Sequence, residues 1–315
     1  MKIFFFGAPQ FSKEILKCLL ENKIPLDTVI THPDQPVGRK KEFQPTPTKT
    51  LAQDNNIPVK EFHKLDEKAL DFFKNAQPDL FIVASYGAIL PAKLLDIPKF
   101  GALNVHPSVL PKYRGASPIQ TALLNGDSET GTTIMLMDKG MDTGDILSQK
   151  ELSIKPTETY PKLEQQLADL SNQLLIPIIQ RIIATEENPT GASQDDTKAT
   201  YTKMIKKQNG LIDWSKPAIE IYNQWRAFYS WPKIHTLYNN QKLTLTEIEL
   251  SPKNVIINNN NHFPGKIYTD SNNNLVIGTG KGFIQINRLQ LAGKNELFTK
   301  EFLNGHQNFT KTTLR

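Results

Sequence analysis

Asn104 and His106 are two polar side chains that stand two residues apart at the end of a short apolar run, Ala102 to Val105. Because side chains two apart on a strand point to the same side, we expect both to face one point where the strand ends. Lys112 and Arg114 follow in the next loop. An amide donor, an imidazole and nearby cations suit a reaction in which negative charge builds up on an oxygen. The same residue types also occur where an asparagine caps an ordinary turn beside a buried structural histidine.

A second polar segment, Met135 to Ile146, follows an expected strand and contains Asp138, Asp142 and Asp145 among glycines. Such segments are often plain turns, and the ligand spacing of an EF-hand calcium site is absent. A carboxylate from this loop could approach His106 and stabilise its imidazolium form. The residue pattern leaves open which of the three aspartates would do so.

A sheet must position these side chains, and strands rich in Ile, Val and Phe alternate with helical patterns over the first part of the chain. This order predicts an α/β fold with a Rossmann-like, doubly wound and mostly parallel sheet. Such sheets bind ligands beyond the carboxyl ends of their strands, where Asn104 and His106 would lie. Pro177 should kink or interrupt the last helix of this part. The expected strands are 2–6, 26–31, 57–59, 80–84, 102–105 and 132–136, and the expected helices are 10–21, 66–74, 119–124 and 159–185.

The length of 315 residues exceeds a typical single core and indicates two domains. We expect a catalytic domain over 1–185, a linker over 186–207 and a second domain over 208–315. After a helix over 217–228, the second domain has short β-like runs split by Asn-rich turns, which predicts a smaller OB-like β-barrel. The glycines at positions 278, 280 and 282 lie between two such runs and indicate a hairpin turn. No Gly-x-Gly-x-x-Gly follows the first strand and no Walker-A lysine is present, which argues against a classical dinucleotide or P-loop site.

The net charge of +5 is unevenly distributed. Residues 1–197 carry 21 Lys and Arg against 25 Asp and Glu, whereas residues 198–315 carry 16 against 7. A basic second part suits a polyanionic partner, although a solubilising surface would give the same count. A further basic run, Arg39-Lys40-Lys41, lies in a Pro-rich stretch over 32–50. We expect this stretch to be either a mobile phosphate-gripping loop or a solvated surface loop.

Cys18 is the only cysteine of the chain. A single cysteine excludes internal disulfides and a Cys-based metal cage, and it fits a reducing cytoplasm. Its apolar neighbours on an expected helix indicate a core position and not a nucleophile. The apolar run over 3–6 is too short for a signal peptide or a membrane span and indicates a buried strand.

Two motifs of the chain resemble those of the folate-dependent formyltransferases. They are Asn104-x-His106 with Ser108-Val109-Leu110-Pro111 and Arg114-Gly115, and Met141-Asp142-Thr143-Gly144-Asp145. Over nearly its whole length the chain is similar to the branch of that family that acts on methionyl-tRNA. The segments that carry this similarity are 34–39 in the basic loop and 210–214, 263–267, 289–294 and 301–305 in the second domain.

The resemblance implies transfer of the formyl group of 10-formyltetrahydrofolate to the α-amino group of methionyl-initiator tRNA, for use in translation initiation. It implies a catalytic trio of Asn104, His106 and Asp142. It also implies a cytoplasmic, monomeric enzyme that needs no metal. The residues implied for substrate contact are Ser108, Val109, Leu110 and Pro111 for the folate, and Arg39, Lys40 and Lys41 for the tRNA.

Two other functions remain compatible with these motifs. One is a formyltransferase of the same core that acts on a nucleotide or an amino sugar, which would not need a basic second domain. The other is a non-catalytic RNA-binding relative, which would not need Asn104, His106 and Asp142 together. The chain also departs from the family pattern in one place near the basic run, where Lys40 follows Arg39 in place of a usual glycine.

Overall fold

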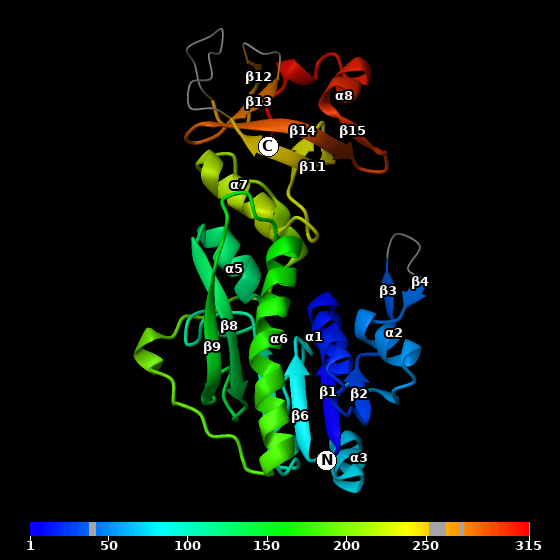
Figure 1. Ribbon diagram of the computed structural model, residues 1–315. Helices are drawn as coiled ribbons and strands as arrows, with labels where there is room; N and C mark the ends of the chain where they lie inside the picture. Colours follow the sequence, from blue (N-terminus) through cyan, green and yellow to red (C-terminus); the bar gives the residue numbers. More distant parts are fainter. Residues whose placement is uncertain (38–41, 252–262, 271–273, 315) are drawn as a thin grey trace. The chain divides into compact units, whose positions relative to one another are not determined.

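The computed structural model describes residues 1–37, 42–251, 263–270 and 274–314. The chain forms two compact units, and both are discontinuous in sequence (Figure 1). The first unit contains Met1–Pro118, Glu129–Ile154 and Leu163–Lys203. The second contains Ile119–Ser128, Lys155–Lys162 and Met204–Arg315.

The first unit is built on a seven-stranded sheet with the strand order β5-β2-β1-β6-β7-β8-β9. The five strands from β5 to β7 are parallel, and β8 and β9 are antiparallel to their neighbours. The predicted fold class, a doubly wound and mostly parallel α/β sheet, is therefore confirmed. The strands are β1 (Ile3–Gly7), β2 (Thr28–Thr31), β5 (Val59–Glu61), β6 (Leu80–Ala84), β7 (Ala102–His106), β8 (Glu129–Leu136) and β9 (Ile146–Ser153).

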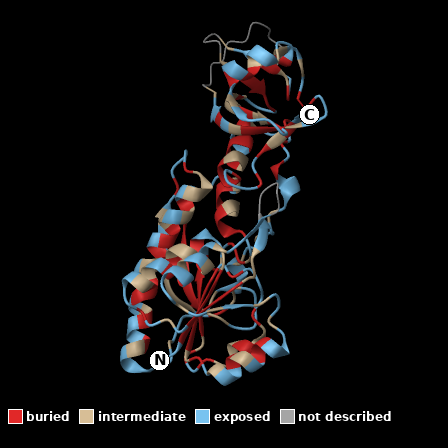
Figure 2. Cartoon of the chain, turned by 90° about the vertical axis from the view of Figure 1, so that its right-hand side faces the viewer, coloured by how far each residue is buried: buried red, intermediate tan, exposed pale blue. Residues whose placement is uncertain are grey.

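Helices cover both faces of this sheet, because its central strands are apolar on both sides. Every residue of β1, β6 and β7 is buried, and Figure 2 shows these strands in red between helices with pale outer surfaces. Phe4, Phe6 and Phe81 face a cluster with α3 and α4, whereas α1 packs on the other face and its Ser12 hydroxyl donates to the Ala84 carbonyl. The helices of this unit are α1 (Gln10–Glu21), α2 (Pro47–Asp54), α3 (Glu67–Ala76), α4 (Ala92–Leu95) and, from Leu163 onward, α6 (Tyr160–Thr185). Helix α5 (Pro118–Asn125) belongs to the second unit except for its first residue.

Three local predictions differ from the structure. The stretch over 32–50, expected to be one loop, contains the short hairpin of β3 (Gln35–Val37) and β4 (Glu42–Gln44) and the start of α2. Thr46 caps α2 through a hydrogen bond from the Lys49 amide, and Pro47 occupies its first turn, where proline is favourable. Strand β9 was not expected, because its three apolar residues do not alternate along the strand and none of its residues is buried. Pro177 does not interrupt α6, which is one helix from Tyr160 to Thr185.

The second unit is built on an antiparallel sheet with the strand order β10-β11-β14-β13-β12, and β15 pairs with β14. The long strand β14 pairs with three others along its length, and β11 changes register near Glu247. This curled sheet agrees with the predicted OB-like β fold, and the glycines after β13 form the expected hairpin into β14. Helix α7 (Ala218–Ala227) precedes the strands and α8 (Thr299–Gly305) follows them. The strands are β10 (His235–Tyr238), β11 (Gln241–Leu250), β12 (Ile267–Thr269), β13 (Leu275–Gly278), β14 (Phe283–Leu291) and β15 (Glu296–Phe298).

Within the residues that the structure describes, none of the helices combines the length and the apolar character needed to cross a membrane.

Candidate active site

Strand β7 carries both Asn104 and His106, and it lies between the parallel strand β6 and the antiparallel strand β8. Asn104 is paired in register with Val83 of β6 and Met135 of β8. Both polar side chains are nearly buried, with 9% of Asn104 and 4% of His106 exposed. The apolar strand thus presents two buried polar groups at the carboxyl end of the parallel part of the sheet, as the spacing predicts.

Of the three aspartates in the β8–β9 loop, the structure brings Asp142 to these two residues. Its carboxylate oxygen Oδ1 accepts a hydrogen bond from Asn104 Nδ2 at 3.3 Å. The other oxygen, Oδ2, accepts one from the Gly115 amide at 2.7 Å and lies 3.7 Å from His106 Nδ1. Asp138 instead closes its own turn by accepting bonds from the Gly140 amide and the Thr143 hydroxyl.

His106 is oriented by contacts on both of its ring nitrogens. Nε2 lies 3.0 Å from the Tyr113 carbonyl oxygen, and Nδ1 faces the Asp142 carboxylate at 3.7 Å. A carbonyl oxygen can only accept, so Nε2 carries the hydrogen in this contact. The distance to Asp142 is too long for a hydrogen bond, so the carboxylate acts there as a nearby charge.

The loop after β7, which the resemblance assigns to folate, is held by one hydrogen bond of its own and by hydrogen bonds to Thr133 of β8 and Gln149 of β9. The Ser108 hydroxyl donates to the Lys112 carbonyl at 2.6 Å, and the Thr133 hydroxyl donates to the Ser108 carbonyl at 2.7 Å. Ser108 and Leu110 are buried, whereas Val109 and Pro111 are partly exposed. Side-chain contact from this segment to a ligand would therefore come from Val109 and Pro111.

Arg114 is fully buried, and its guanidinium bonds to other side chains of the first unit. Its guanidinium donates to Asp196 Oδ1 at 2.7 Å and to Gln194 Oε1 at 2.8 Å. Burial lowers the pKa of Arg114, but the interactions with Asp196 and Tyr201 outweigh it, so the pKa is raised above its ordinary value. The partners of Arg114 come from the stretch that the sequence indicated as a linker. Sequence reasoning missed these residues, because the Gln194-Asp195-Asp196 run carries no motif of its own.

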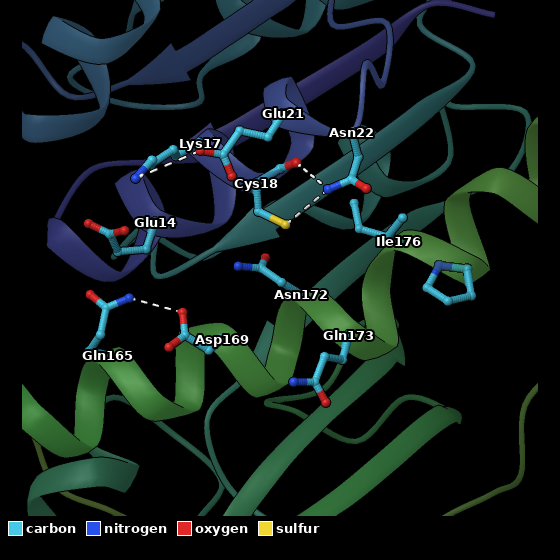
Figure 3. Close-up of a pocket in the computed structure, with 11 residues that line it drawn as sticks. Glu14, Lys17, Cys18, Glu21, Asn22, Gln165, Asp169, Asn172, Gln173 and Ile176 are labelled. Carbon is cyan, nitrogen blue, oxygen red and sulfur yellow. Dashed lines mark hydrogen bonds and ion pairs between the residues drawn. The ribbon is translucent and has the colours of Figure 1, made fainter.

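Arg39, Lys40 and Lys41 lie outside the described residues. In the described ranges, no three His, Cys, Asp or Glu side chains come together as a set of metal ligands. A hollow of about 500 Å³ between α1 and α6 contains Cys18 and none of the residues of the Asn104 site (Figure 3).

Comparison with protein families identifies both units. Residues 1–179 match the family described as formyl transferase, and residues 204–307 match the formyl transferase C-terminal domain. The two matches together span most of the chain.

Curated relatives match over nearly the whole chain. A methionyl-tRNA formyltransferase from Thermotoga neapolitana is 40% identical over 306 residues, covering 97% of this chain and 95% of that protein. Relatives of the same name from Dehalococcoides mccartyi and Clostridium novyi are 37% and 36% identical over 317 residues. They cover all of this chain and 98% and 100% of their own.

Solved structures share the fold at low sequence identity. An N-formyltransferase from Helicobacter canadensis, solved with folinic acid and dTDP-3-aminofucose, is 23% identical, with a TM-score of 0.64 over 91% of this chain and 98% of its own. HypX from Aquifex aeolicus, solved with tetrahydrofolic acid, is 13% identical, with a TM-score of 0.66 over 98% of this chain and 47% of its own.

Proposed function

The chain belongs to the methionyl-tRNA formyltransferase family, and from this membership we propose that it formylates the α-amino group of methionyl-initiator tRNA with 10-formyltetrahydrofolate as the donor. The observation that supports a specific site for this reaction is that Asn104, His106 and Asp142 lie close together at the end of β7. The product, formylmethionyl-tRNA, would serve translation initiation in the cytoplasm, and the enzyme would act as a monomer.

The reaction is a direct transfer between two nitrogens. The amine nitrogen attacks the formyl carbon and forms a new C–N bond, which places negative charge on the former carbonyl oxygen. The bond between that carbon and N10 of the folate then breaks, while the amine loses a proton and the leaving nitrogen gains one. Holding both substrates in this geometry removes much of the entropic barrier.

Asn104 and His106 are the donors proposed to stabilise the charged oxygen. One hydrogen of the Asn104 amide is used by Asp142, and no other hydrogen bond of this amide occurs within the described residues. Its second hydrogen can therefore point to a substrate oxygen, and a protonated His106 ring can add another donor. Preorganised donors of this kind act at the point where charge develops, and they need no rearrangement during the reaction.

Asp142 orients the two donors and is the acceptor proposed for the amine proton, directly or through a water molecule. Its Oδ2 already takes the Gly115 amide hydrogen at 2.7 Å, so the carboxylate is fixed with respect to both catalytic loops. A fixed carboxylate suits general-base catalysis, which depends on positioning before basicity.

The second unit and the basic run at 39–41 are proposed to bind the tRNA. The excess of Lys and Arg over Asp and Glu after residue 197 supports this assignment, because phosphate contacts dominate the affinity of proteins for nucleic acids. A small acceptor would need no such surface, and the full-length relatives also favour tRNA over an amino sugar.

A comparison of acceptors tests the proposal. Purified protein is supplied with 10-formyltetrahydrofolate and, in separate reactions, with methionyl-initiator tRNA, an amino-sugar nucleotide and a glycinamide ribotide. Formylation of the methionyl-tRNA alone is expected. If either small amine is formylated faster than methionyl-tRNA, the proposed acceptor is wrong. If none of the three is formylated, the result favours a non-catalytic relative.

A further inference from the structure

Residues 192–202, which we call the strap, run across both loops that carry the catalytic trio. At one end, Ala192 exchanges backbone hydrogen bonds with Ile146 just after the Asp142 loop. At the other end, the Arg114 amide donates to the Thr200 carbonyl at 2.8 Å, and the Thr202 amide donates to the Arg114 carbonyl at 2.8 Å. The strap therefore holds the loop after β7 and the loop after β8 together within the first unit.

Gln194 is the residue of the strap that bonds to both loops through one side chain. It is half-buried, whereas residues 191–193 and 195–198 are exposed. Its Oε1 accepts from Arg114 Nε at 3.2 Å and from Arg114 Nη2 at 2.8 Å. Its Nε2 donates to the Asp142 carbonyl at 2.9 Å and to the Gly144 carbonyl at 2.7 Å.

The orientation of this amide group follows from its partners. A guanidinium can only donate and a backbone carbonyl can only accept, so the oxygen of Gln194 must face Arg114 and its nitrogen must face the loop. A glutamate side chain has the same length and could keep the Arg114 contact. It would, however, turn an acceptor oxygen toward the two carbonyls.

The turn that Gln194 holds has an unusual backbone. Asp142 adopts a left-handed conformation with φ of +54°, which most side-chain-bearing residues avoid and which aspartate and asparagine tolerate best. Gly144 is also constrained, because a Cβ added there would lie 1.8 Å from the Leu136 carbonyl oxygen. The two carbonyls that accept from Gln194 belong to these two residues, so its amide supports the turn on both sides of Thr143.

We propose that Gln194 is a positioning residue: it fixes the Asp142–Gly144 turn and thereby sets the Asp142 carboxylate against Asn104 and His106. This role rests on the proposed function, since Asp142 must take part in the transfer for its position to matter. In the described structure, the Gln194 side chain contacts Asp142 only at the backbone carbonyl of Asp142. Gln194 therefore acts on the reaction only through Asp142.

The test compares Gln194→Glu and the uncharged Gln194→Met with the wild type. Either variant loses the two bonds to the loop, so kcat for methionyl-tRNA formylation should fall about tenfold or more, while both KM values change little. Gln194→Met also removes two acceptor bonds from the buried Arg114 and should lower the Tm, whereas Gln194→Glu keeps them. Gln180→Glu makes the same charge change on an exposed position of α6 and should leave kcat unaltered. Unchanged kcat in both folded Gln194 variants would overturn the proposal.

A double-mutant cycle separates positioning from a general structural role. In an Asp142→Asn background, Gln194→Met should lower kcat hardly further, because the group that it positions is already disabled. A full additional loss would show that Gln194 acts by another route and would overturn the proposal.

Hydrogen exchange at the amides of residues 138–145 gives a readout that does not need activity. Exchange should be faster in Gln194→Met than in the wild type, and equal exchange would contradict the positioning role. The two proposals can fail separately. If the wild type does not formylate methionyl-tRNA, the proposed function is wrong. If Gln194→Met nevertheless speeds the exchange of residues 138–145, Gln194 still supports the turn.

Discussion

The Asn104 amide is the donor whose loss should be felt most directly in the reaction. Its side chain is nearly buried and is held by Asp142, so no neighbouring group can take its place without movement. Removing one oxyanion donor costs about 10²- to 10³-fold in turnover. Asn104→Ala should therefore lower kcat by that order with little change in Tm, as measured by steady-state formylation. The exposed Asn188→Ala serves as the control, and an Asn104→Ala enzyme as fast as the wild type would exclude the donor role.

Cys18 offers a pH-dependent test because it is the only thiol of the chain. Burial raises the pKa of Cys18, and the negative charges of Glu21 and Asp169 raise it further (Figure 3). A raised pKa leaves less thiolate at a given pH, so alkylation at pH about 8 should be slower than for a free thiol of ordinary pKa, about 8.5.

Glu21→Gln removes one of these charges and should speed the alkylation of Cys18. Glu14→Gln, on the same helix and lining the same hollow, is the matched control and should leave the rate unchanged. Mass spectrometry at several pH values measures the alkylation rate. Equal alkylation rates in the wild type and Glu21→Gln would contradict the electrostatic part of this explanation.

Among single residues, the predictable ones were those whose role follows from local spacing. Asn104 and His106 stand two apart on one strand, so their common direction is visible in the sequence. The choice of Asp142 over Asp138 and Asp145 needed the family resemblance, because it depends on how a distant loop folds back. Gln194 could not be predicted, since its partners are a buried arginine and two main-chain carbonyls far away in sequence.

At the scale of elements, Pro177 gives a stability prediction. Proline in a helix interior removes a hydrogen bond and crowds the preceding turn, yet α6 is continuous through this exposed position. Replacing it by alanine restores the amide and should stabilise the protein by about 2 kcal/mol, after allowing for the more flexible unfolded chain. Denaturant unfolding measures the change.

Pro161 provides the matched control for this substitution. It lies in the first turn of α6, where the missing amide would have no partner in the helix. Pro161→Ala should therefore give no gain in the free energy of unfolding. A Pro177→Ala protein that is no more stable than Pro161→Ala would show that the helix is locally adapted to the proline.

Elements with strong periodic or apolar patterns were predictable, and weakly patterned ones were not. The buried strands β1, β6 and β7 and the helix α1 lie close to the expected ranges. Strand β9 is an edge strand without a buried residue, so its sequence has no apolar alternation to detect. The hairpin of β3 and β4 consists of two three-residue strands among prolines, which local propensity alone does not favour.

At the scale of the whole molecule, the uneven charge leads to a salt prediction. The basic excess beyond residue 197 should release counterions when tRNA binds. Raising the salt concentration from about 50 to 200 mM should therefore weaken tRNA binding by about tenfold or more, with a much smaller effect on 10-formyltetrahydrofolate. Equilibrium binding of each substrate to the full-length protein measures this, and equal losses for both would argue that the charge only keeps the protein in solution.

The proposed transfer of a formyl group to methionyl-initiator tRNA takes place at Asn104, His106 and Asp142. Its most direct test is the transfer of a labelled formyl group from 10-formyltetrahydrofolate to methionyl-initiator tRNA, with both substrates saturating, by the wild type and by Asp142→Asn. Asparagine tolerates the left-handed backbone of position 142. Its side chain has one acceptor oxygen, so the variant removes the carboxylate charge together with one of the two hydrogen bonds that Asp142 accepts from Asn104 and Gly115. We predict that the wild type produces labelled formylmethionyl-tRNA and that the variant does so at a rate at least about 10²-fold lower. No transfer by the folded wild type, or equal rates for the two proteins, would contradict the claim.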